Sequence, residues 1–290
     1  MKNKQQIIKV TFGGVLVIVS LLTFIKPYFD DNYETSVFSW YEEQVINFDD
    51  TFRTLSTLKV STIYQFISYN PDVELIDDFL ESATKYEKNV YFLTGEPEWA
   101  LDPEATELKA YIETINMFKK KHTSLKGIVI DVEPQSLDEY QESPAEVMSL
   151  FVQAMKTAYT AAHKVGLEVV LCLPNSLDTL GFEKDLDILI RDASDSVAIM
   201  NYHRGQEIER IETEAILSAK YNKPIINIYE LQPAGTFDLT EENTYFNHGV
   251  TAVYENYKYM KNVFDTQEIF LSLHEFQHLR ILHQFSVTSQ

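Results

Sequence analysis

An apolar run near the middle of the chain, residues 127–130, ends in two carboxylates, Asp131 and Glu133. Because side chains alternate between the two faces of a strand, residues at positions i and i+2 point the same way. Two like charges in one small space cannot both ionise freely, so the pKa of one carboxyl should rise toward neutrality. Such a pair provides a general acid beside an anion, which is the chemistry of glycosidic bond cleavage. The alternative is a strand end whose acids cap the next helix or face solvent.

Short strand-like runs alternate with longer helical patterns from residue 36 onward. Ser143, followed by Pro144 and Glu146, marks a helix start, and Gly166 suits a helix end. Alternating strands and helices imply parallel strands covered by helices, and eight such units predict the α/β class with a closed (β/α)8 TIM barrel over residues 31–290. An open doubly wound sheet is the alternative, but no Gly-x-Gly-x-x-Gly loop follows an early strand. The predicted strands are residues 36–40, 60–67, 89–93, 127–131, 168–173, 196–202, 224–229 and 268–273.

The active site of such a barrel lies at the C-terminal ends of its strands. Aromatic, amide and acidic side chains gather at these positions in the sequence. A sugar-binding site needs this mixture, because pyranose faces stack on aromatic rings while hydroxyl groups take hydrogen bonds. The residues predicted to contact a carbohydrate substrate are Trp40, Tyr64, Gln65, Trp99, Asn175, Met200, Asn201, Glu230 and His274.

The first residues of the chain predict a membrane anchor. Lys2, Lys4 and Lys9 precede a stretch without charge, residues 10–25, which is long enough to cross a bilayer when its flanks are included. No small-x-small cleavage site follows it. Residues 1–30 are therefore predicted to be a short cytoplasmic tail and an uncleaved transmembrane helix. The lysines place the barrel outside, which predicts a single-pass cell-membrane protein with an extracellular C-terminal domain.

The net charge limits the kinds of partner that the protein can bind, and the cysteine content limits its disulfide bonds. The formal net charge of −20 argues against binding to nucleic acid and fits a neutral substrate. Cys172 is the only cysteine, so no disulfide framework exists. It lies in an apolar run, residues 169–173, and is predicted to be an inert core residue.

At its fourth predicted strand the chain resembles the family 18 glycoside hydrolases, which include chitinases and endo-β-N-acetylglucosaminidases. That strand of the family ends in Asp-Gly-x-Asp-x-Asp-x-Glu, and Gly127, Asp131 and Glu133 match its glycine, last aspartate and glutamate. Lys126 and Val129 stand where the family has its two earlier aspartates.

A second motif of this family lies on the sixth strand and reads Asp-x-x-x-x-Met-x-Tyr-Asp. Asp195, Met200 and Tyr202 keep its spacing, while His203 replaces the final aspartate. The eighth strand lacks the usual tryptophan of the family. The resemblance covers residues 36 to about 276 and implies the same barrel.

The resemblance implies substrate-assisted hydrolysis of β-linked N-acetylhexosamine glycans with retention, without a cofactor or metal. Glu133 would protonate the glycosidic oxygen. Asp131 would orient the 2-acetamido group of the substrate, whose carbonyl oxygen attacks the anomeric carbon, and Tyr202 would hydrogen-bond that group. One acid, one positioning anion and one phenol suffice, because the substrate supplies the nucleophile.

Two other functions remain open from the sequence. Because Lys126 and Val129 replace acidic residues, the barrel could bind a glycan or a protein without hydrolysis. His274-Glu275-Phe276-Gln277-His278 matches the His-Glu-x-x-His motif of zinc proteases, in which one helix holds both histidines. However, the residues before this motif have the pattern of the last barrel strand, and no acidic residue follows it.

Overall fold

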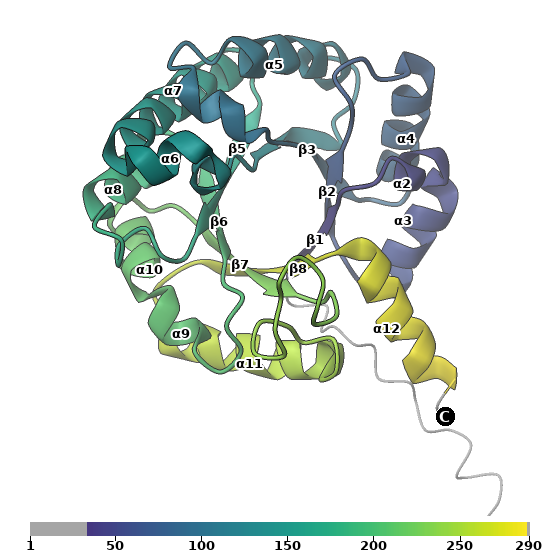
Figure 1. The fold of residues 1–290 in the computed structure, drawn as a ribbon. Helices are drawn as coiled ribbons and strands as arrows, with labels where there is room; N and C mark the ends of the chain where they lie inside the picture. The colour runs from purple at the N-terminus through teal and green to yellow at the C-terminus, as the bar shows by residue number, and fades with distance from the viewer. Residues whose placement is uncertain (1–33, 289–290) are drawn as a thin grey trace, which may run out of the picture.

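Eight parallel strands close into a barrel in the computed structural model, which describes residues 34–288 (Figure 1). Each strand pairs with the next in chain order, and β8 pairs with β1 to complete the ring. The closed ring confirms the predicted barrel and excludes the open sheet. The strands are β1 (Thr35–Ser39), β2 (Thr62–Phe66), β3 (Asn89–Thr94), β4 (Leu125–Ile130), β5 (Glu168–Pro174), β6 (Ser196–Met200), β7 (Ile225–Glu230) and β8 (Ile269–His274).

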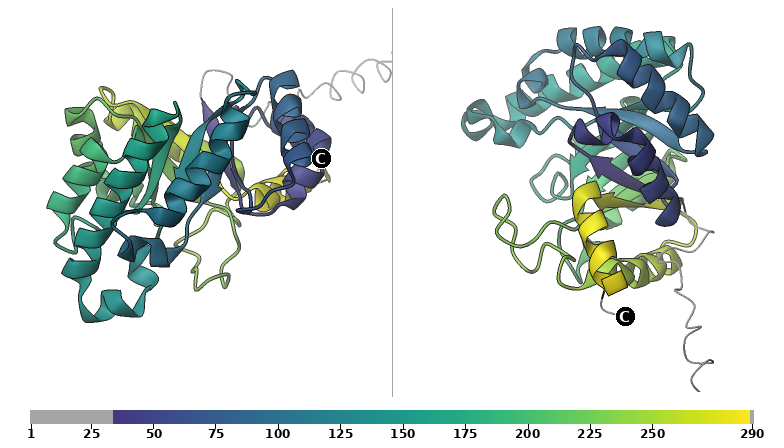
Figure 2. Two further views of the ribbon diagram at one scale, coloured as in Figure 1. Left: turned by 90° about the horizontal axis from the view of Figure 1, so that it is seen from above. Right: turned by 90° about the vertical axis from the view of Figure 1, so that its right-hand side faces the viewer.

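Helices surround this ring on its outer side (Figure 1). In Figure 2, α6 and the segment between β7 and α11 project from the same end of the barrel, where the strands finish. The helices are α2 (Glu43–Ile46), α3 (Phe48–Thr57), α4 (Val73–Lys85), α5 (Thr106–Lys119), α6 (Asp138–Glu142), α7 (Pro144–Lys164), α8 (Glu183–Asp192), α9 (Glu207–Arg210), α10 (Glu212–Lys220), α11 (Gly249–Val263) and α12 (Phe276–Thr288), with 3₁₀ turns η1 (Pro97–Leu101) and η2 (Pro134–Ser136).

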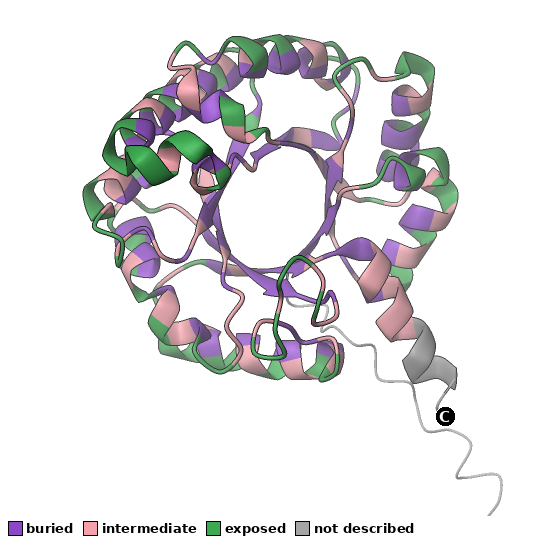
Figure 3. Cartoon of the chain, in the orientation of Figure 1, coloured by how far each residue is buried: buried purple, intermediate pink, exposed green. Residues whose placement is uncertain are grey.

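The barrel has two apolar cores, because alternate residues of each strand face opposite sides. The larger core lies between the strands and the helices. The smaller one fills the barrel itself, so the ring is a packed interior and not a pore. Figure 3 shows that the strands of the ring are mostly buried. The buried members of the smaller core are Phe38, Tyr64, Leu93, Val129, Val170, Cys172, Ala198, Ile226 and Ile228. Membership of one core or the other therefore shows which way each strand residue points.

The helix before β5 begins and ends at the predicted residues. Helix α7 starts at Pro144, and the backbone N–H of Glu146 donates to the carbonyl of Ser143. The side chain of Ser143 makes no capping hydrogen bond, although this residue precedes the helix as its sequence predicts. Gly166 has φ of 75°, a conformation that a glycine adopts without steric cost and that turns the chain into β5.

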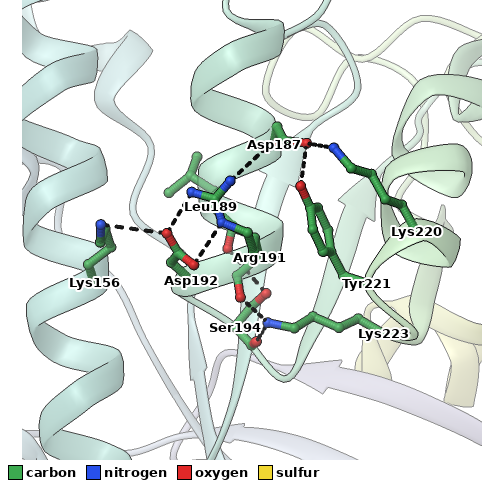
Figure 4. A network of polar contacts seen from close by, with 9 residues as sticks. All are labelled: Lys156, Asp187, Leu189, Arg191, Asp192, Ser194, Lys220, Tyr221 and Lys223. Atoms are coloured by element: carbon green, nitrogen blue, oxygen red, sulfur yellow. Dashed lines mark hydrogen bonds and ion pairs between the residues drawn. The ribbon is translucent and has the colours of Figure 1, made fainter.

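The entry into β6 is fixed by polar contacts around the C-terminal end of α8 (Figure 4). Lys223 donates from Nζ to the carbonyls of Arg191 and Ser194, which satisfies backbone acceptors at the helix end. Asp195, the first residue of the sixth-strand motif, accepts hydrogen bonds from the backbone of Val169 and the hydroxyl of Tyr159. It lies just before β6 begins, so its contacts join β5, β6 and α7 at the far end from the candidate site.

The predicted localisation is corrected by the structure. No helix in the described part of the chain is long and apolar enough to cross a membrane. The segment on which the prediction rested, residues 1–30, lies outside the described residues. Anchoring of the protein in a membrane by a single helix is therefore not supported.

Candidate active site

The backbone after β4 turns Asp131 and Glu133 toward the axis of the barrel. Val129 belongs to the core inside the barrel, whereas Ile130 and Val132 pack in the outer core. Asp131 and Glu133 share the orientation of Val129 by alternation. The backbone N–H of Asp131 donates to the carbonyl of Thr94 at 2.8 Å, which extends the pairing of β3 and β4 by one residue.

A glycine directly after the neighbouring strand β3 lets the chain approach Asp131. A Cβ atom at Gly95 would lie 1.9 Å from the backbone oxygen of Asp131. No side chain fits there without moving the backbone that carries the carboxyl group. Gly95 therefore positions Asp131 although it contributes no functional group of its own.

Other side chains reach the same end of the barrel interior from four further strands. Trp40, Met200 and Tyr202 pack against the inner core from β1 and β6. Glu230 and His274, the last residues of β7 and β8, lie opposite each other in the sheet and are joined by a hydrogen bond. The rings of Tyr202 and His274 are 6.0 Å apart. These residues and the two carboxylates form the candidate site.

Burial dominates the electrostatics of the two carboxyl groups. Burial and, next to it, the charge of Glu133 together raise the pKa of Asp131 to about 7, against the opposing effect of His274. Burial also raises the pKa of Glu133, again against His274. Oδ1 of Asp131 is buried and has no hydrogen-bond partner within the described residues. The pair can therefore hold a proton near neutral pH, as general acid catalysis requires.

The thiol of Cys172 is a further neighbour of Asp131. Cys172 lies in the core inside the barrel, and its thiol lowers the pKa of Asp131 against the effect of burial. Cys172 is buried in the core, as predicted, but the prediction did not place its thiol beside Asp131. The alternation of side chains along β5 could have predicted this position, because Cys172 points inward two residues before the strand ends.

Removing the charge of Asp131 is expected to stabilise the protein at high pH. The folded protein binds more protons than the unfolded chain between pH 3.8 and about 7, so stability falls as the pH rises through this range. Asn cannot ionise. At pH 8, Asp131→Asn should therefore raise the free energy of unfolding by about 1–3 kcal/mol, allowing for partial solvent screening.

The gain should largely disappear at pH 3.5, below the ordinary pKa of 3.8, where Asp131 is mostly protonated in both states. Urea denaturation of both proteins at the two pH values measures it. Asp265→Asn, at an exposed position after α11, is the matched control and should change little at either pH. An equal effect of Asp131→Asn at both pH values would contradict the assignment.

The phenol of Tyr202 stays protonated at neutral pH. Burial raises its pKa well above the usual value, and the charges of Glu230 and Asp131 add to the shift. Its backbone carbonyl accepts a hydrogen bond of 2.6 Å from Asn243, in the segment after β7. Tyr202 therefore remains a hydrogen-bond donor beside the carboxyl pair.

His274 makes two hydrogen bonds that the sequence does not reveal. Its Nδ1 lies 2.8 Å from Oε2 of Glu230, and its Nε2 accepts from Nε1 of Trp40 at 3.2 Å. The other carboxylate oxygen of Glu230 accepts from the backbone N–H of Gln232 at 2.7 Å. Three predicted substrate contacts, Trp40, Glu230 and His274, are thus joined in one network.

Other predicted contacts lie away from this group. Tyr64 is buried in the middle of the inner core, between the rings of Phe38 and Tyr91. Phe66, two residues later, is the inward side chain nearest the strand end, and its ring lies 6.2 Å from that of Trp40. Gln65 points outward and donates to the carbonyls of Tyr41 and Phe66.

Trp99 and the two predicted asparagines also face the outer side. Trp99 lies in η1 and packs in the outer core against Tyr69. Asn175 donates to Asn201, which donates in turn to Asn227 on β7 at 2.9 Å. This buried amide chain links the ends of β5, β6 and β7. It supports the site from behind and does not face its interior.

The geometry disfavours the zinc motif. His274 ends β8, whereas His278 lies on α12, so one helix does not hold both histidines. Both ring nitrogens of His274 are engaged, and the carboxylate of Glu275 caps α12 by accepting from the backbone of Gln277 and His278. Within the described residues, no group of three or more candidate ligands could hold a metal ion.

Comparison with known proteins gives the fold. No family model and no curated protein matches the sequence. A candidate alpha-L-fucosidase of Bacteroides thetaiotaomicron is 13% identical, with a TM-score of 0.58 over 88% of this chain and 92% of that chain. A candidate deoxyribose-phosphate aldolase of Toxoplasma gondii is 8% identical, with a TM-score of 0.57 over the same shares.

The intracellular xylanase TsXylA of Thermoanaerobacterium saccharolyticum is 12% identical, with a TM-score of 0.54 over 86% of this chain and 87% of that chain. Glycosidases and an aldolase thus align with this barrel about equally well. One fold carries many reactions, so at these identities the likeness establishes the TIM barrel, and function must be argued from the site.

Proposed function

We propose that this protein is a glycoside hydrolase, which cleaves β-linked N-acetylhexosamine-containing glycans with retention of anomeric configuration. The observation that carries the proposal is the inward orientation of Asp131, Glu133 and Tyr202 at the C-terminal end of one barrel. Each senses the charge of another, since Glu133 raises the pKa of Asp131 and both carboxylates raise that of Tyr202. Glycosidases among the structures that share this fold are consistent with the proposal.

The reaction divides among three groups. Glu133 donates its proton to the glycosidic oxygen as the bond to the anomeric carbon breaks, and the acetamido oxygen of the substrate bonds to that carbon. Asp131 accepts a hydrogen bond from the acetamido nitrogen and balances the positive charge of the oxazolinium ion. Tyr202 donates a hydrogen bond to the acetamido group. Water, deprotonated by Glu133, then opens the ring, and two inversions give net retention.

The surroundings of Asp131 support its role. One carboxylate oxygen has no partner within the described residues, so it can accept the substrate amide. Val129 fills the inner core beneath it, where the resembling family has an acid. Glu133 is the carboxylate whose charge raises the pKa of Asp131, and this coupling should make the pH dependence of the pair sensitive to Glu133.

Product analysis on a panel of N-acetylhexosamine oligomers tests the proposal. We expect cleavage of β-linked oligomers, with the β-anomer as the first product seen by proton NMR. Chelation of divalent metals should leave the rate unchanged. Inversion, or cleavage that chelation abolishes, would contradict the proposed mechanism. Binding of oligomers without turnover would instead favour a barrel that binds glycans and does not hydrolyse them.

A further inference from the structure

One imidazole at the candidate site lies between two neighbours that favour opposite charge states. The indole N–H of Trp40 can only donate, so its 3.2 Å contact requires an unprotonated Nε2 on His274. This contact holds the ring neutral, with its proton on Nδ1. On the other side, Nδ1 faces the carboxylate of Glu230 at 2.8 Å, which favours the imidazolium ion.

Nearby carboxylates shift the titration of His274 toward the charged form. Burial lowers the pKa of His274, but the hydrogen bond and charge of Glu230, with the charges of Glu275 and Asp131, more than offset it, and the net pKa is raised. Glu230 is 2% exposed and is held by the backbone of Gln232, so it cannot turn away to solvent. Protonation of His274 therefore requires Trp40 to give up its contact.

The charge on this imidazole acts on both carboxyl groups of the site. A protonated His274 lowers the pKa of Asp131 and of Glu133, while Asp131 and Glu275 raise the pKa of His274 in return. The charged or titratable groups that face His274 are Glu230 on β7, Asp131 and Glu133 after β4, Tyr202 after β6 and its neighbour Glu275. His274 is the member of this set whose protonated form carries a positive charge.

We propose that His274 is a positioning residue, whose charge state sets the number of protons on Asp131 and Glu133. Glu230 on one side and Trp40 on the other determine that charge state. This inference rests on the proposed function for its catalytic consequence, but its electrostatic part is independent of turnover.

The pH profile of kcat/KM tests the catalytic part through two variants with opposite signs. Glu230→Gln removes the stabilisation of the imidazolium, so the pKa of both carboxyls rises and the bell-shaped profile should move up by about one pH unit. His274→Gln should move it the same way. Trp40→Phe removes the donor that favours the neutral ring, so the profile should move down.

The position of the profile, not its height, is the readout, because Trp40→Phe would also weaken stacking on a sugar. Trp99→Phe, in the outer core, is the matched control and should leave the position unchanged. A purely structural role for His274 predicts lower rates with an unmoved profile. That result, or equal signs for Glu230→Gln and Trp40→Phe, would overturn the proposal.

NMR titration keeps the inference separate from the proposed function. The imidazole of His274 and the carboxyl carbons of Asp131 and Glu133 are followed against pH in the protein without substrate. Glu230→Gln should lower the pKa of His274, and Trp40→Phe should raise it. His274→Gln should raise the pKa of both carboxyls. If these shifts occur but no glycan is cleaved, the proposed function fails and the electrostatic assignment stands; if they are absent, the assignment itself is wrong.

Discussion

Replacing Glu133 with glutamine is expected to lower turnover of β-linked N-acetylhexosamine oligomers by about a hundredfold or more. Glutamine keeps the shape of the side chain but has no proton to transfer to the leaving oxygen. The hydrogen bond that Glu133 accepts from Gln135 at 2.6 Å can be retained by the amide oxygen, so the local fold should persist. Initial rates and calorimetric binding of the same oligomer measure the two effects separately.

Binding should change much less than turnover, because the proton matters only as the bond breaks. Glu139→Gln, at an exposed position on α6, is the matched control and should leave both quantities unchanged. If wild-type protein and Glu133→Gln bind the oligomer and show the same rates, the barrel is not a hydrolase of this kind. A substrate with an activated leaving group should rescue the variant in part, since such a group needs no proton.

Asp131→Asn is expected to be nearly as damaging to turnover, with a loss of about a hundredfold. The neutral amide cannot balance the positive charge that develops on the oxazolinium ion. Because the same substitution should stabilise the folded protein above pH 7, unfolding cannot account for the loss. Steady-state kinetics of both proteins at pH 8, with thermal denaturation of the same samples, measures the two together.

The substrate supplies a second test of this role. Oligomers that lack the 2-acetamido group should not be cleaved by either protein, because no internal nucleophile is present. Cleavage of such glycans by the wild-type protein would assign Asp131 a different function. A variant that loses activity together with stability would point to a structural role for Asp131 instead.

The barrel and the orientation of the carboxyl pair follow from local patterns in the sequence. Strand runs and helix signals repeat every few tens of residues, and parallel strands joined by helices have few ways to close. The two-residue period of a strand places Asp131 and Glu133 on one side, and it does the same for Met200 and Tyr202. Applied to every strand residue, the same period also predicts that Phe66 points inward while Gln65 points outward. It predicts likewise that Cys172 points inward while its neighbours in the sequence point outward.

The tertiary structure alone decided which polar groups meet. Trp40 and His274 are 234 residues apart and touch because the ring closes between β1 and β8, while Glu230 reaches His274 across the pairing of β7 and β8. Trp99 has an aromatic ring on which a sugar could stack, but it lies in the turn η1, which packs against α7. The zinc-like motif is divided between a strand and a helix. Hydrogen bonds between distant strands depend on register and closure, which are properties of the whole sheet, and so no local pattern of residues encodes them.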